Sequence, residues 1–121
     1  MPPREVAAYL LDVRVAAERV VRIVGGLSED QYGADENVRL VVERSLEIIG
    51  EALRQAIARE PALEMKITDA RRIVQFRNFL AHAYHLVDHS IVWKIAQVNV
   101  PVLLAEVAAM MEQDKGERES S

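Results

Sequence analysis

The fold is decided by a long amphipathic stretch, residues 36–59, which reads ENVRLVVERSLEIIGEALRQAIAR. Its apolar residues recur every three or four positions, which is the period of an α-helix and not the alternation of a strand. The positions expected to face the core are Val38, Val41 or Val42, Leu46, Ile49, Leu53 and Ile57. Pro61 is expected to end this helix, because proline cannot continue the backbone hydrogen bonding.

The same period appears on both sides of this stretch. Residues 4 to about 24 form a first helix, ended by Gly25-Gly26, and its predicted core positions are Val6, Leu10, Val13, Ala17, Val20 and Val24. Residues 27–37, LSEDQYGADEN, are predicted to form a loop in which Ser28 and Gln31 make a weak helix cap. The pattern therefore indicates helices joined by short connections.

Three further features place the remaining helices. Thr68 or Asp69 is expected to cap a third helix, and Asp88 a fourth. Pro101 either kinks the fourth helix or begins a fifth one with Asn99 as its cap. The predicted fold is an all-α, up-and-down bundle of four to five helices, with one domain at residues 1–113 and a flexible tail at 114–121.

Composition limits the classes of function. The chain has 121 residues, no cysteine and a net charge of −4, so disulfides, thiolate zinc sites and general nucleic-acid coating are disfavoured. No apolar run is expected to reach the roughly 18 to 20 residues of a membrane span, and no signal peptide is expected. We therefore expect a cytoplasmic protein that does not bind membranes.

The charge is unevenly distributed along the chain. Residues 66–94 carry five basic and two acidic side chains, a net charge of +3, which leaves −7 for the remainder. All three histidines fall in the same window. A local basic region on an acidic body is typical of a specific anionic ligand.

The stretch QFRNFLAHAYH, residues 75–85, concentrates polar side chains on the third helix. On a helical wheel Arg77, Asn78, His82 and Tyr84 lie on one side, and the predicted apolar face contains Ile73, Phe76, Phe79, Leu80 and Ala83. A solvated helix face is one interpretation. The other is recognition of phosphate, because Arg, Asn, His and Tyr are directional donors and acceptors and this face has no Lys or Glu.

Three segments resemble one family. RNFLAHAY, residues 77–84, is similar to the motif of the HepT-like branch of the HEPN superfamily, and residues 44–53, RSLEIIGEAL, and 87–95, VDHSIVWKI, resemble the family's flanking helices. The sequence departs from the family at His85 and Leu86, where relatives often carry an aromatic residue and a glycine. This difference leaves all motif residues in place.

The resemblance implies a fold, an activity and partners. It implies a helical bundle that dimerises and acts as a metal-independent endoribonuclease, the toxin of a type VII-like toxin–antitoxin module. Its substrate would be RNA such as tRNA or mRNA. A minimal nucleotidyltransferase antitoxin would neutralise it by adding AMP and would form a larger hetero-oligomer with it. By position, Arg77 and His82 would be catalytic, Asn78 supporting and Tyr84 the site of AMP addition.

The residue types fit such chemistry. RNA carries its own nucleophile, the 2′-hydroxyl, so cleavage needs a proton acceptor and a cation for the charge that grows on the phosphate. Histidine and arginine supply these two functions. On one helix Arg77 and His82 point about 140° apart, so we expect a two-fold interface that brings two copies of the motif into one cleft.

Other interpretations remain open. His82, His85, His89 and Asp88 could form a metal site, although no metal or other cofactor is expected. The acidic series Glu43, Glu47 and Glu51 is expected to be a solvated stripe or to pair with Arg39, Arg44 or Arg54. Trp93, Met110 and Met111 are expected in the core. A non-catalytic dimeric protein that binds a nucleotidyltransferase is the alternative function.

Overall fold

The computed structural model of the chain describes residues 4–82 and 87–120. Its elements, in chain order, are α1 (Arg4–Val24), α2 (Glu29–Ala34), α3 (Glu36–Arg59), α4 (Leu63–Lys66), α5 (Ala70–His82), α6 (His89–Lys94), the π-helical turn η2 (Ile95–Asn99) and α7 (Val100–Ser120). These described ranges contain no strand. The predicted all-α fold is therefore confirmed, as are the bounds of the first two long helices.

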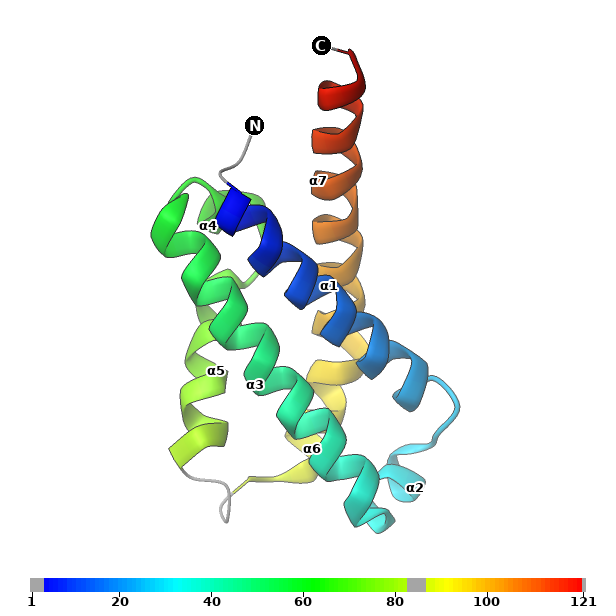
Figure 1. Cartoon of the computed structure of the whole chain (residues 1–121). Coiled ribbons are helices and arrows are strands. Elements are labelled where there is room, and N and C mark those ends of the chain that lie inside the picture. Colours follow the sequence, from blue (N-terminus) through cyan, green and yellow to red (C-terminus); the bar gives the residue numbers. More distant parts are fainter. Residues whose placement is uncertain (1–3, 83–86, 121) are drawn as a thin grey trace.

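Helix α3 lies between α1 and α5 in the bundle (Figure 1). It packs against α1 on one side and against α5 on another, and α7 packs against α1. All six predicted core positions of α1 are buried, and α3 buries Val42, Leu46, Ile49 and Leu53. Val41, the alternative to Val42, is 43% exposed, so the structure resolves that choice.

Residues 27–37 are not simply a loop, so that prediction is wrong. Gln31 N–H donates to Ser28 Oγ at 3.1 Å, and Ser28 N–H donates to Gln31 Oε1 at 2.9 Å, which completes the capping box of the short helix α2. Tyr32 of α2 is fully buried, and its ring lies 5.3 Å from that of Trp93. Burial of this tyrosine provides the tertiary contact that six helical residues would otherwise lack.

The C-terminal helical segment is interrupted once. Asp88 caps α6 as predicted, accepting the Ser90 N–H at 2.9 Å. The α-helical hydrogen bonding then changes to a π-helical turn just before Pro101, which fits the missing N–H and bulky ring of proline. Asn99 lies within this turn and donates to Asp69 Oδ2 at 3.4 Å, so it is not the predicted cap.

Helix α7 continues through residue 120, past the predicted domain limit at residue 113, and the flexible tail stays a prediction. The helical segment at residues 89–117 is long enough and apolar enough to span a membrane, judged by length and composition alone. The sequence-based expectation was that no segment would be. In this fold Val100, Leu103 and Val107 of that segment are buried in the bundle core.

Asp69, one of the two predicted caps, directly precedes α5, and its carbonyl oxygen accepts the Ile73 N–H at 3.1 Å. The Thr68 hydroxyl donates to Glu106 Oε2 of α7 at 2.9 Å, and the Asp69 carboxylate accepts from Asn99. Both predicted caps therefore bond to the C-terminal segment. Asp69 has a φ of 58°, a left-handed conformation that an aspartate tolerates better than most side chains.

The side of α5 that packs on α3 is rotated from the predicted apolar face. Leu80 is buried, Ile73 and Phe76 are half-buried, and Phe79 is 41% exposed. The cause is Gly50 of α3: a methyl group built there would overlap Arg77 Cβ and lie 2.9 Å from Arg77 Cγ and 3.3 Å from the Ile73 carbonyl oxygen. Arg77 therefore packs its aliphatic stem on α3, between Ile73 and Leu80 along the helix.

This contact predicts the effect of Gly50→Ala. Overpacking of a tight helix contact costs about 1–3 kcal/mol, which exceeds the gain of about 1 kcal/mol from replacing a helical glycine. We expect a lower free energy of unfolding in urea. Gly116→Ala is the matched control, because no described atom outside its own turn of α7 lies within 4 Å of a methyl group built at Gly116. Equal stability of the two variants would contradict the close packing.

Candidate functional site

The candidate site is built on α5 and the adjoining turns of α3. The Arg77 side chain is 30% exposed, with its guanidinium at the surface. Its Nη1 donates to Asn78 Oδ1 at 2.9 Å, and its Nη2 lies 3.4 Å from Glu51 Oε2 of α3. Asn78, the predicted supporting residue, thus contacts the predicted catalytic arginine directly.

His82 is exposed at the last residue of α5. Five residues separate it from Arg77, which corresponds to about 7.5 Å along the helix axis and about 140° around it. Asn78, Phe79 and Ala81 on the same turns are also exposed. Tyr84, predicted to carry AMP, and Ala83 and His85 lie outside the described residues.

Glu51, which forms the ion pair with Arg77, also accepts hydrogen bonds from side chains of its own helix. Arg54 donates two hydrogen bonds to the Glu51 carboxylate, from Nη2 at 2.8 Å and from Nε at 3.2 Å, and Gln55 Nε2 donates a third at 3.0 Å. The hydrogen bonds from Arg54 and then Gln55 lower the pKa of Glu51 to about 2. The carboxylate is therefore charged at any pH near neutrality.

The two other glutamates of the acidic series differ from each other: Glu47 is ion-paired as predicted, whereas Glu43 is half-buried rather than solvated. Glu47 pairs with Arg44 at 3.0 Å. Glu43 lies near Arg39, and burial raises the pKa of its carboxyl group. The prediction of ion pairs is confirmed for Glu47 and Glu51, but it omitted Arg77 as a partner of Glu51.

The basic residues of the 66–94 window do not form one patch. Arg71 pairs with Glu64 at 3.1 Å, and Lys66 lines a cavity at the far end of α7. Lys94 lies on α6. Arg77 lies at the start of the 77–84 motif, where it donates to Asn78. The local basic region predicted from charge is therefore dispersed over three helices.

The alternative metal site receives no support from the residues that the structure describes. No group of three or more His, Asp or Glu side chains among them has a geometry for holding a metal ion. The His89 ring packs against α2, where its Nε2 lies 2.7 Å from a methyl group built at Gly33. His85 of this proposed cluster lies outside the described ranges.

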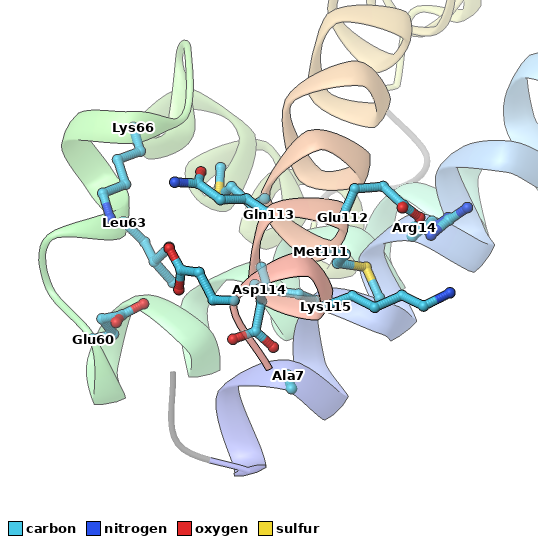
Figure 2. A pocket seen from close by; sticks show the side chains of 13 residues that line it. Ala7, Arg14, Glu60, Leu63, Lys66, Met111, Glu112, Gln113, Asp114 and Lys115 are labelled. Atoms are coloured by element: carbon cyan, nitrogen blue, oxygen red, sulfur yellow. The ribbon is translucent and has the colours of Figure 1, made fainter. Parts of the chain in front are cut away.

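A small groove of about 250 Å³ between α3, α5 and the C-terminal helix is mostly apolar and is lined by Leu46, Ile49, Arg72, Ile73, Phe76, Ile95, Asn99, Val100 and Leu103. A larger cavity of about 730 Å³ lies between α1, α4 and the end of α7 (Figure 2). Both basic and acidic side chains line it, including Arg14, Glu60 and Lys66.

Comparison with known proteins identifies the family of this chain. A family model described as Ribonuclease HepT-like matches residues 13–110. The chain belongs to the HepT-like ribonuclease family. The resemblance seen in residues 77–84 and in the two flanking segments is thereby confirmed at the level of the family.

Several relatives of this HepT-like chain carry ribonuclease names. A protein of Methanocaldococcus jannaschii, named as a candidate RNase, is 32% identical over 107 residues, covering 88% of this chain and 97% of that protein. A candidate ribonuclease HepT of Thermococcus cleftensis is 30% identical over 95 residues, covering 78% and 86%. A candidate RNase of Caldanaerobacter subterraneus subsp. tengcongensis is 27% identical over 107 residues, covering 88% and 95%. No solved structure matches the chain significantly.

Sequence reasoning did not identify Gly50 and Glu51 as part of the site of this HepT-like chain. One signal was available: a glycine inside a helix costs about 1 kcal/mol relative to alanine, and it often marks a close approach of another backbone or side chain. The residue next to such a glycine can then contact the element that packs on the glycine. Here the approaching element is the motif helix itself.

Proposed function

We propose that this HepT-like chain is a metal-independent endoribonuclease and the toxin of a type VII-like toxin–antitoxin pair. The observation that carries the proposal is the placement of Arg77 and His82 on one accessible helix in a chain of a ribonuclease family. The substrate would be a cytoplasmic RNA such as tRNA or mRNA. The activity would need no metal or cofactor, because RNA supplies the nucleophile.

The proposed reaction is transfer to the 2′-hydroxyl. His82 takes the proton of that hydroxyl, the 2′ oxygen forms a bond to phosphorus, and the bond from phosphorus to the 5′ oxygen breaks. The leaving oxygen receives a proton from solvent or from the second histidine of a dimer. Arg77 donates to the phosphoryl oxygens as their charge grows, which is the interaction that usually contributes most. Asn78 holds one edge of the Arg77 guanidinium.

The direction of the two side chains supports a dimeric site. Arg77 and His82 differ by about 140° around α5, so one phosphate cannot easily contact both from a single copy. The exposed side of α5, with Asn78, Phe79, Ala81 and His82, leaves room for a second copy of the motif helix. A two-fold axis there would pair Arg77 of one copy with His82 of the other.

The first prediction concerns the two proposed catalytic residues. His82→Ala should lower RNA cleavage by about 10²- to 10⁴-fold, the usual contribution of a general base. Arg77→Lys should also lose most activity, because it keeps the stem packed on Gly50 but removes the forked donors. Cleavage of total tRNA and mRNA, measured in excess EDTA, gives both rates.

The matched controls are His89→Ala and Arg71→Lys, which change the same residue types at surface positions away from Gly50 and Glu51. Both should cleave RNA at the wild-type rate, and all four variants should keep the wild-type circular dichroism. If His82→Ala cleaves as fast as His89→Ala, the catalytic assignment is wrong. A wild-type protein that binds a nucleotidyltransferase but cleaves no RNA would favour the non-catalytic interaction protein.

The second prediction concerns the dimeric site. Neither Arg77→Lys nor His82→Ala homodimers should cleave RNA, but a purified heterodimer of the two should regain activity, because it contains one site with both residues intact. Copies carrying different affinity tags allow the heterodimer to be isolated and assayed. A stable monomer with full activity, measured by light scattering and cleavage, would contradict the dimeric site.

The third prediction concerns Tyr84, the proposed site of AMP addition by a minimal nucleotidyltransferase antitoxin. An AMP group on Tyr84 would add a negatively charged phosphate to the motif. That phosphate would compete with RNA for Arg77. Co-expression with the neighbouring nucleotidyltransferase should add AMP units in intact-mass spectra, and Tyr84→Phe should abolish the addition while remaining toxic. AMP on Tyr9 or Tyr32 instead would exclude this site.

A further inference from the structure

Glu51 occupies a position that a phosphate-binding site would ordinarily avoid. Its carboxylate lies 3.4 Å from the guanidinium proposed to bind RNA, where a negative charge opposes the negative charge of the ligand. Such a residue needs a function that outweighs this repulsion, or a neighbour that neutralises it. The contacts around Glu51 show both features.

The neutralising neighbour is Arg54. It forms a two-pronged interaction with Glu51 at 2.8 and 3.2 Å, and this pair carries no net charge. Gln55 adds a third donor at 3.0 Å, and its own Oε1 accepts Arg59 Nη1 at 2.7 Å. The carboxylate is therefore held in one orientation by donors on its own helix. The positive charge of Arg77 remains available to a phosphate.

The restraint on Arg77 comes from both ends of the side chain. Its stem lies against Gly50, the residue just before Glu51, so the side chain crosses α3 at a fixed place. Glu51 then forms an ion pair with Nη2 at 3.4 Å, and Asn78 accepts a hydrogen bond from Nη1. Among residues 4–82 and 87–120 no other side chain pairs with this guanidinium, so its remaining N–H groups can donate to phosphoryl oxygens in a set direction.

We propose that Glu51 is a positioning residue that fixes the direction of the Arg77 guanidinium toward the RNA phosphate. The proposal rests on the proposed ribonuclease function. Because Glu51 acts through Arg77 and bears a negative charge, its removal should slow the chemical step without weakening RNA binding. If Glu51 only stabilised the fold, its removal would not slow the chemical step while leaving RNA affinity unchanged.

The test compares Glu51→Gln with Glu47→Gln. Glu47 lies one turn earlier on α3 and pairs with Arg44 at 3.0 Å. Both substitutions remove one negative charge and an ion pair with an arginine of α3, but Glu51→Gln also removes the ion pair with Arg77. Glu51→Gln should lower kcat by about 10- to 100-fold, the scale of a misplaced reacting group. Its affinity for uncleavable 2′-O-methyl RNA should equal that of Glu47→Gln, and the pH profile of cleavage should keep its shape.

Two further measurements separate positioning from folding. Glu51→Asp retains the charge and should recover part of the lost kcat, and the urea unfolding midpoints of Glu51→Gln and Glu47→Gln should agree. The proposal is overturned if the two glutamine variants cleave at the same rate. It is also overturned if kcat and RNA affinity fall together with stability.

An NMR measurement distinguishes failure of this proposal from failure of the proposed function. Rotation of the Arg77 guanidinium, followed through its Nε–Hε group, should be slow in the wild-type protein and in Glu47→Gln and faster in Glu51→Gln. A wild-type protein that cleaves no RNA refutes the proposed function. Unchanged Arg77 rotation in Glu51→Gln refutes the positioning role, whatever the cleavage assay shows.

Discussion

The contact between Gly50 of α3 and Arg77 of α5 sets the geometry of the motif. Without a side chain at Gly50, the stem of Arg77 lies directly on the backbone of α3. This close approach fixes both the distance between α3 and α5 and the rotation of α5 about its axis. Arg77 therefore has two functions: its methylene groups pack in the bundle, and its guanidinium reaches the surface, as long basic side chains commonly do.

The charge around Arg77 is balanced by its neighbours on α3. A lone carboxylate beside a phosphate-binding arginine would cancel its charge. Arg54 pairs with Glu51 more closely than Arg77 does, 2.8 Å against 3.4 Å, so Glu51 is neutralised mainly from its own helix. The same hydrogen bonds keep the Glu51 pKa low, and the carboxylate stays an acceptor near neutral pH. An acidic protein can in this way present one oriented cation to an anionic ligand.

The rotation of α5 also decides what the motif helix exposes. With Arg77 directed toward α3, the side that carries Phe79, Ala81 and His82 faces away from that contact and is exposed. Helix α5 packs mainly on α3 in the bundle (Figure 1). The proposed dimer would cover the exposed ring of Phe79 and the neighbouring exposed His82.

The sequence determined the fold class, the limits of α1 and α3, the Asp88 cap and the motif on the third helix. It did so because helical periodicity, glycine or proline after a helix, and side-chain caps act within a few residues of one another. It missed α2, because the burial of Tyr32 against Trp93 joins residues 61 positions apart in the chain. It also placed Arg77 on the polar side of α5 and treated Glu51 as one of a series of surface acids. Only the tertiary structure decided the direction of Arg77 and its contact with Glu51. The absence of a side chain at Gly50 lets α5 approach α3 closely, and α5 follows much later in the chain.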